Sequence, residues 1–414
     1  MLQCCTRRTA QNPRFQQVAA SSAWTSGAAL RPAPLQRRTT ATAPMAAAAP
    51  PKAAAAAATA AEPGRARDPA ALWDEIVSVY NRGQALGVSS IAETKPELCR
   101  DDSLGVDFVL RVATALRAKP QLPPQAPEQD KAAAAAAQPA ARPWRNPFMP
   151  PEPELTVCKV GAAGTHTAVL NKFNVVEHHV VVITNKFRSQ AEPLSGEDLA
   201  AALEVLEAMP QGGVAFYNCG PESGRSQPHK HLQVVPLPFM EGQPPQAPVH
   251  VLVEAAMAAA AAAGTAGGGG GSSTSTAAPL QPLQLRQLPY QCFATPLPDS
   301  PTPEQLGAAC DALLQLAFPG YSYSPTPAMA SLPAGASPTD TVTAAAVAAG
   351  SVSYNVLVTR QWLMLVPRRA ECCGPLALNS LAFAGTILVR SEEVLGFVRE
   401  KGPAAILAEI GVPW

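Results

Sequence analysis

Hydrophobic residues recur at helical spacing in three segments that also carry helix-capping signals. The first begins at Asp68 and ends near Gly83, with apolar residues three or four positions apart. The second follows Ser195, where Asp198, three residues later, completes a capping box. The third covers Thr302–Leu316. These segments predict three amphipathic helices, each with one face in a core.

Apolar runs of strand length lie between and after these helices. They cover residues 105–116, 165–171, 180–184, 214–218, 229–236, 353–359 and 362–367. A helical tail is expected after Ser391. This mixed, hairpin-rich order predicts an α+β fold, an antiparallel sheet with flanking helices, rather than a doubly wound parallel sheet. The strand–turn–strand sequence of 353–367 parallels that of 216–236, which favours an internal duplication into two half-domains.

Alanine-, proline- and glycine-rich segments divide the chain into an expected domain organisation. It comprises a disordered leader (1–65), an N-terminal catalytic half (66–240) with an insertion at 120–143, a flexible linker (241–280), and a C-terminal half (281–414) with an insertion at 325–350. The first 61 residues lack Asp and Glu but contain six arginines, which is typical of an organellar transit peptide. We therefore expect localisation in the chloroplast, with the mitochondrion and then the cytoplasm as alternatives.

Charge and cysteine content limit the function classes. Lys plus Arg and Asp plus Glu are equal at 31 each, so no net charge attracts the chain to nucleic acid or a membrane. No apolar stretch has the roughly 20 residues that a membrane span needs. The nine cysteines form no C-x-x-C pair, so neither a disulfide framework nor a zinc ribbon is indicated. The composition leaves small-molecule substrates as the expected partners, and the oligomeric state stays open.

Candidate chemistry gathers in the segment 220–236. On a strand, alternation of side chains places His229, His231 and Gln233 on one face and Lys230 on the other. The preceding loop, GPESGRSQ, has glycines that let backbone N–H groups approach a phosphate. Two histidines can bind a metal, but no further ligands stand at motif spacing, and a buried structural pair is a second alternative. Nucleophilic attack on phosphorus explains the combination best, because neutral imidazole is available near neutral pH.

The segment FYNCGPESGRSQPHKHLQVVPLP resembles the H-x-H-x-Q motif of the transferase branch of the histidine-triad superfamily. More closely it resembles the diadenosine tetraphosphate phosphorylases, also called ATP adenylyltransferases. Other matching blocks are NPF at 146–148, VLNKFNVVEHHVVVIT at 169–184, SYNVLVTRQWLMLVPRR at 353–369 and NSLAFAGTILV at 379–389. The similarity extends over 68–414 apart from the low-complexity insertions.

This resemblance implies a two-step displacement. The second histidine of the motif, His231, attacks the α-phosphorus of diadenosine tetraphosphate (Ap4A) and ATP leaves; phosphate then accepts AMP, which gives ADP. His229 would orient His231 or stabilise charge, and Gln233 would hold the phosphoryl group. The implied substrate-binding residues are Lys119, Asn171, Lys172, Asn218, Gly224, Arg225, Ser226, Gln227, Leu357, Val358, Thr359, Met364 and Arg368. Arg225 departs from the pattern, because fungal relatives usually have a small hydroxyl residue there.

No covalently held cofactor or protein-bound metal is implied, although a polyphosphate substrate can bring a divalent cation such as Mg²⁺ with it. Two other functions remain open. A hydrolase of the same superfamily would use water as acceptor and release AMP rather than ADP. A nucleotide sensor without turnover would keep the glycine loop but would not need His231 and Gln233 on one face.

Overall fold

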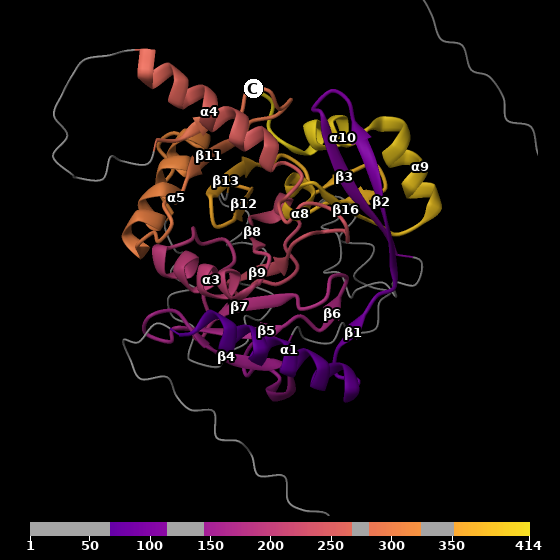
Figure 1. Ribbon diagram of the computed structural model, residues 1–414, viewed down its shortest axis with the longest axis vertical. Helices are drawn as coiled ribbons and strands as arrows, with labels where there is room; N and C mark the ends of the chain where they lie inside the picture. The colour runs from indigo at the N-terminus through magenta and orange to yellow at the C-terminus, as the bar shows by residue number, and fades with distance from the viewer. Residues whose placement is uncertain (1–66, 114–144, 267–280, 324–351) are drawn as a thin grey trace, which may run out of the picture. The chain divides into compact units, whose positions relative to one another are not determined.

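Nine antiparallel strands form the main sheet of the computed structural model, which describes residues 67–113, 145–266, 281–323 and 352–414 (Figure 1). In order across the sheet they are β10 (Leu283–Gln284), β11 (Phe293–Pro296), β13 (Trp362–Pro367), β12 (Tyr354–Val358), β8 (Gly213–Cys219), β9 (His231–Pro236), β7 (Val180–Thr184), β5 (His166–Leu170) and β4 (Thr156–Val160). Every neighbouring pair is antiparallel.

The main sheet consists of two copies of one motif that meet at the pair β8 and β12. The first copy runs β5, β7, α3 (Gly196–Ala208), β8 and β9 along the chain, and the second runs β10, β11, α5 (Pro303–Ala317), β12 and β13. Outward from the centre, the strands of the first copy are β8, β9, β7 and β5, and those of the second are β12, β13, β11 and β10. In both copies the order across the sheet is therefore the same relative to the order along the chain. This topology confirms the α+β fold with two duplicated halves, and it makes β13 the counterpart of β9.

Helices α3 and α5 approach each other closely where α3 begins with a glycine. A Cβ atom on Gly196 would lie 1.7 Å from the carbonyl oxygen of Pro303, so only glycine permits this approach. Each helix has a capping box, formed by Ser195 and Asp198 in α3 and by Thr302 and Gln305 in α5. The capping residues therefore behave as the sequence predicts, and each box contributes about 1 kcal/mol to helix stability.

The two faces of the main sheet are covered differently. One face packs against α1 (Pro69–Ala85), α3 and α5 in a continuous core. The other face, over the C-terminal copy, packs against a three-stranded sheet and C-terminal helices. These elements are β16 (Thr386–Val389), β3 (Val106–Ala113), β2 (Thr94–Asp101), α8 (Ser380–Ala384), α9 (Glu392–Lys401) and α10 (Pro403–Ile410). Over the N-terminal copy, Val214, Phe216 and Val235 belong to this second core, and the described part of β5 and β7 adds a small separate cluster of Val169, Val181 and Ile183 beside Phe148.

The remaining elements are short, apart from one helix. They are β1 (Ser90–Ile91) paired with β6 (Phe173–Asn174), β14 (Cys372–Cys373) paired with β15 (Leu376–Ala377), the 3₁₀ turns η2 (Pro153–Leu155) and η3 (Pro221–Ser223), and α4 (His250–Ala266). The sequence predicts 241–280 as a flexible linker, and α4 corrects this prediction for its own residues. Alanine has the highest helix propensity, so an alanine run next to an ordered segment continues as helix.

Most predicted elements are present with shifted ends. The strand expected at 229–236 begins at His231, because His229 makes only an isolated bridge with Ser189. The sequence pattern does not predict strand β2, since its alternation is weak and only one of its eight residues is buried. Lys119, the leader (1–65) and the two predicted insertions lie outside the described residues.

Candidate active site

His231 begins β9 and His229 lies two residues before it, and both rings contact the same phenylalanine. The ring centroid of Phe148 is 5.6 Å from that of His229 and 5.3 Å from that of His231. Both histidines are buried, whereas Gln233 on the same strand is partly exposed. The structure therefore brings the three motif residues to the less covered face of the sheet, as the alternation of the strand predicts.

The ring of His229 has a hydrogen-bond partner at each nitrogen. Its Nε2 lies 2.9 Å from the carbonyl oxygen of Thr184, so Nε2 must carry the proton and donate it. The hydroxyl oxygen of Thr184 is also 2.9 Å from Nε2. Nδ1 lies 3.0 Å from Nδ2 of Asn146, an amide nitrogen that can only donate. These contacts fix His229 as the neutral tautomer protonated on Nε2.

His231 adopts the opposite tautomer. Its Nδ1 lies 2.7 Å from the carbonyl oxygen of His229, which only accepts, so Nδ1 carries the proton. The pKa of His231 is lowered to about 4, mainly by burial; the hydrogen bond to the His229 carbonyl opposes this shift, and the His229 ring adds a smaller lowering. Burial likewise lowers the pKa of His229 to about 4. At neutral pH His231 is therefore uncharged, with its lone pair on Nε2.

The side chain of Gln190 separates β8 from β9 next to His231. Its Oε1 accepts from the backbone N–H of His231 at 2.8 Å, and its Nε2 donates to the carbonyl oxygens of His231 and Asn218, each at 3.1 Å. The backbone on either side pairs with the histidine segment, since Gln190 N donates to Pro228 O and Lys230 N donates to Arg188 O, both at 2.8 Å. Segment 188–190 thus replaces β8 as the neighbour of β9 where the histidines stand.

The glycine-rich loop between β8 and β9 packs tightly against the C-terminal half. Gly224 has a φ of 78°, and a Cβ there would lie 2.5 Å from the carbonyl oxygen of Leu378. Ser226 is exposed, whereas Gly224, Arg225 and Gln227 are partly buried. Burial lowers the pKa of Arg225, and Glu371 opposes this shift. Arg225 makes no hydrogen bond to any described residue, so its guanidinium keeps donors for a ligand.

Asn218 and Arg368, two predicted substrate contacts, belong to a buried network between the halves. Asn218 Oδ1 accepts from Nδ2 of Asn355 at 2.9 Å and from the hydroxyl of Ser380 at 2.7 Å. Arg368 donates to Oδ1 of Asn355 at 2.5 Å and to the carbonyl oxygens of Ser223, Ala370, Glu371 and Leu378. This network holds the glycine loop in place, and substrate contact by either residue stays a prediction.

The other predicted contacts occupy two separate regions. Asn171 and Lys172 follow β5; Nδ2 of Asn171 donates to Phe173 O at 2.8 Å, and Nζ of Lys172 pairs with Glu152 at 2.7 Å. Leu357, Val358, Thr359 and Met364 are buried in β12, in β13 and in the turn between them. Leu357 lies opposite Phe216, which lies opposite Gln233, so Leu357 and its partner Met364 continue the row that starts at the motif. Val358 instead packs in the core on the other face of the sheet.

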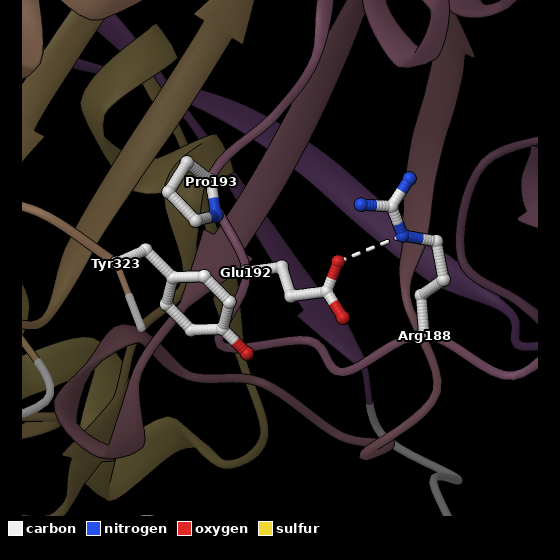
Figure 2. Close-up of a pocket in the computed structure, with 4 residues that line it drawn as sticks. All are labelled: Arg188, Glu192, Pro193 and Tyr323. Carbon is white, nitrogen blue, oxygen red and sulfur yellow. Dashed lines mark hydrogen bonds and ion pairs between the residues drawn. The ribbon is translucent and has the colours of Figure 1, made fainter. Parts of the chain in front are cut away.

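Two cavities border the histidine strand. One of about 500 Å³ lies past its end, lined by residues that include Ile91, Arg111, Val176, Pro236 and Pro238. The other, of about 350 Å³, lies against the segment that flanks the histidines and is lined by Arg188, Glu192, Pro193 and Tyr323 (Figure 2). In this second cavity Nε of Arg188 donates to Glu192 at 2.7 Å, so its charged groups largely satisfy one another.

Asn146, Thr184 and Gln190 are the site residues that sequence reasoning missed. Asn146 falls in a segment noted only for its resemblance, Thr184 ends a predicted strand without any sign of a role in the site, and nothing in the local pattern marks Gln190. Within the described ranges no three His, Cys, Asp or Glu side chains gather as a metal-binding group. No helix in these ranges has the length and apolar character to cross a bilayer.

Comparisons with known proteins give the same assignment to both halves. Residues 62–255 match the model of the Ap4A phosphorylase N-terminal domain, and residues 286–413 match that of the ATP adenylyltransferase C-terminal domain. Diadenosine 5',5'''-P1,P4-tetraphosphate phosphorylase 2 of Saccharomyces cerevisiae is 31% identical over 60% of this chain and 70% of its own length. Protein APA1 of the same yeast is 27% identical over 64% of this chain and 76% of its own.

Solved structures agree with this result. Yeast Ap4A phosphorylase Apa2 in complex with AMP superposes with a TM-score of 0.59 at 24% identity, over 84% of this chain and 99% of that chain. Apa2 in complex with Ap4A gives a TM-score of 0.57 over 83% and 97%. The fold, the motif and these matches define a nucleotidyltransferase. The chain belongs to the Ap4A phosphorylase family.

Proposed function

We propose that the protein catalyses phosphorolysis of Ap4A to ATP and ADP, and the reverse adenylyl transfer, through an AMP intermediate on His231. The observation that carries this proposal is the hydrogen bond from Nδ1 of His231 to the carbonyl oxygen of His229. It leaves the lone pair on Nε2, and the low pKa keeps the ring uncharged at neutral pH. The relatives named above as Ap4A phosphorylases support the choice of substrate.

In the first step, Nε2 of His231 attacks the α-phosphorus of Ap4A. The N–P bond forms, the bond from phosphorus to the bridging oxygen breaks, and ATP leaves with the electron pair. The ring becomes positively charged because Nδ1 keeps its proton. The carbonyl dipole of His229 then stabilises the positive charge on the His231 ring. Because this charge is absent from the free enzyme, the interaction favours the transition state over the ground state.

In the second step, an oxygen of inorganic phosphate attacks the same phosphorus, the N–P bond breaks, and ADP is released. Phosphate is already anionic and needs no general base, so positioning and charge stabilisation suffice. Gln233 offers an amide N–H to the transferred phosphoryl group without repelling it. Arg225, Ser226 and the amides of the glycine loop lie on the segment that leads into the histidines and supply donors for the incoming phosphate.

The substrate lies along β9. His231 and the glycine loop stand at one end, and Asn171, Lys172 and the cavity bounded by Pro236 stand at the other. Five residues of strand cover roughly 16 Å, which suits a nucleotide whose phosphate is at His231 and whose nucleoside extends toward Asn171.

Product analysis with labelled inorganic phosphate tests the proposal. We expect unlabelled ATP and ADP labelled in its terminal phosphate, in equal amounts. Labelled phosphate left unused while AMP accumulates would instead identify a hydrolase, and binding without turnover would identify a sensor. Because the polyphosphate binds Mg²⁺, the assay is run with and without the ion.

A separate proposal concerns residues 1–65, which we infer to direct import into the chloroplast. It rests on the absence of acidic residues before Glu62 and on the arginines among Ser, Thr and Ala. A fusion of this segment to a fluorescent reporter should enter chloroplasts. Mitochondrial signal would select the alternative organelle, and diffuse cytosolic signal would refute import.

A further inference from the structure

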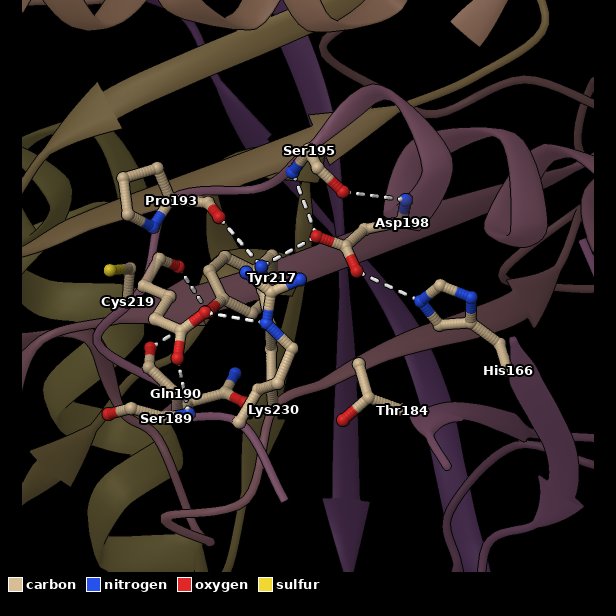
Figure 3. A network of polar contacts seen from close by, with 12 residues as sticks. His166, Thr184, Ser189, Gln190, Pro193, Ser195, Asp198, Tyr217, Cys219 and Lys230 are labelled. Carbon is tan, nitrogen blue, oxygen red and sulfur yellow. Dashed lines mark hydrogen bonds and ion pairs between the residues drawn. The ribbon is translucent and has the colours of Figure 1, made fainter. Parts of the chain in front are cut away.

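A buried ion pair lies directly behind the two histidines. Lys230 stands between them in the sequence, its side chain points to the opposite face of the sheet, and it is fully buried. Its Nζ lies 2.6 Å from Oδ2 of Asp198 and 2.7 Å from the carbonyl oxygen of Pro193 (Figure 3). The chemistry proposed for His231 makes no use of these groups.

Asp198 stays ionised in this position. Burial raises its pKa, but the hydrogen bond from His166 and the charge and hydrogen bond of Lys230 outweigh burial and hold the pKa well below its ordinary value. His166 Nε2 lies 2.9 Å from Oδ1, and Ser195 N donates to Oδ2 at 2.8 Å. The pair is therefore a true ion pair at neutral pH, with both partners anchored to fixed elements.

Stability alone does not account for such a pair. The cost of taking two charges out of water can exceed what their mutual attraction returns, and well-packed apolar residues of similar volume often stabilise a core as well or better. The pair does, however, connect α3 and the 188–193 segment to the residue between the two histidines. The ion pair therefore restricts the position of the backbone at Lys230, which directly follows the His229 carbonyl.

A second connection reaches His229 from the other side. His166 in β5 lies opposite Thr184 in β7, and Thr184 accepts from Nε2 of His229 through both its oxygens. The side chains of His166, Asp198 and Lys230 thus hold the residue next to His229, and the strand that carries His166 pairs with the residue that binds the His229 ring. Both links restrict the position of the carbonyl oxygen that accepts from His231.

We propose that Lys230, Asp198 and His166 are positioning residues, which hold β9 from behind so that Nε2 of His231 points at the reacting phosphorus. This inference rests on the proposed function. None of the three touches substrate. Displacing a nucleophile by a fraction of an ångström slows chemistry without weakening ground-state binding, so the array should act on kcat and leave KM nearly unchanged.

The test uses the double variant Lys230→Met/Asp198→Asn, which removes both charges together and leaves no unpaired ion. The amide oxygen that this variant carries at position 198 can still accept from Ser195 N, so the start of α3 is kept. We expect a melting temperature close to that of the wild type and a kcat for Ap4A roughly 10- to 100-fold lower. KM and the Kd for AMP should stay within about twofold. The matched control Arg399→Met/Glu97→Gln removes an exposed ion pair of 2.7 Å and should leave kcat unchanged.

A folded double variant with wild-type kcat would overturn the proposal, and so would equal losses in kcat and AMP binding, which would indicate a general disruption of the site. If the double variant does not fold, His166→Leu removes the ring's hydrogen bonds to Asp198 and Thr165 and should lower kcat several-fold at unchanged KM; wild-type kcat in that variant would also overturn it. The wild type is assayed first, because a wild type without turnover counts against the proposed function itself rather than against the array.

Discussion

The carbonyl oxygen of His229 accepts a hydrogen bond from Nδ1 of His231 at 2.7 Å. The contact links the two histidines through the backbone of one and the ring of the other. It fixes which nitrogen of His231 carries the lone pair, and it places a dipole next to the positive charge that develops when that nitrogen attacks. The ring of His229 has a different task, because its two nitrogens bind Thr184 and Asn146.

The pH dependence of the reaction should reflect the low pKa of His231, which burial brings to about 4. Only the neutral ring attacks phosphorus, so activity is lost where the ring becomes protonated. With the lowered pKa, kcat/KM for Ap4A at saturating phosphate should stay constant from neutral pH down to about 5 and fall as the pH passes 4. A half-maximal loss near 6.5, the ordinary value, would contradict this account.

Unfolding at low pH is the necessary control for that profile. His229 and His231 bind protons in the unfolded chain below pH 6.5 but in the folded chain only near 4. Their contribution to stability is therefore complete above 6.5 and declines as the pH falls toward 4, by about 1.4 kcal/mol per pH unit for each group. Circular dichroism at each pH separates loss of fold from protonation of the nucleophile.

Substituting Asn146 should change the protonation of His229. In Asn146→Asp, a carboxylate replaces the amide that now donates to Nδ1, so Nδ1 must gain a proton to keep the hydrogen bond. The pKa of His229 then rises, and its charge opposes the positive charge that develops on His231. We expect kcat to fall further in Asn146→Asp than in Asn146→Ala, with the imidazole titration, followed by NMR, moving upward only in the Asp variant. Identical kcat values and identical imidazole titrations in Asn146→Asp and Asn146→Ala would refute the proposed link between Asn146 and the protonation of His229.

Gly224→Ala should damage the site through a collision, not only through backbone strain. Gly224 and Gly212 have nearly equal φ values, 78° and 77°, but a Cβ on Gly212 meets nothing within 4 Å, whereas one on Gly224 lies 2.5 Å from Leu378 O. Gly212→Ala should therefore cost about 1 kcal/mol of unfolding free energy and little activity. Gly224→Ala should cost more and lower kcat by displacing the loop. The test measures the free energy of unfolding in urea and kcat for both variants. Equal losses in Gly212→Ala and Gly224→Ala would show that the collision with Leu378 O has no effect.

Acceptor choice should depend on Gln233. An amide cannot act as a general base near neutral pH, so water receives no help in attacking the adenylate. A histidine at this place can take part in proton transfer. We expect Gln233→His to raise AMP formation relative to ADP formation at fixed phosphate. If both products fall together at an unchanged ratio, Gln233 binds substrate only, and acceptor choice lies with the phosphate-binding residues.

Local signals explain what could be predicted from the sequence. The capping residues of α3 and α5, the apolar run of β7 and the β12–β13 hairpin each depend on neighbours within a few positions. The alternation of the strand expected at 229–236 predicts Lys230 on the face opposite the histidines, and it is buried there. The prediction of a linker at 241–280 did not hold for α4, since composition alone does not distinguish a helical alanine run from a flexible one.

Long-range contacts explain what could not be predicted. Gln190 is 41 residues from the His231 backbone that it binds, and Asn146 is 83 residues from His229. Neither pairing has a periodic pattern, because each depends on how separate segments come together in the folded sheet. The tautomers and the low pKa of both histidines follow from these contacts and from burial, so they became visible only in the structure.

The central claim is that AMP is carried on Nε2 of His231, and trapping that intermediate tests it most directly. The protein is incubated with Ap4A labelled in adenosine, without phosphate, then denatured in alkali, digested and analysed by mass spectrometry. The account predicts an acid-labile adenylate on the peptide that contains His231, released as ADP when phosphate is added before denaturation. The adduct should be absent from His231→Ala and slower to form in His229→Ala, which keeps the backbone carbonyl. An adenylate on another residue, or ADP formation by a folded His231→Ala protein at the wild-type rate, would contradict the account.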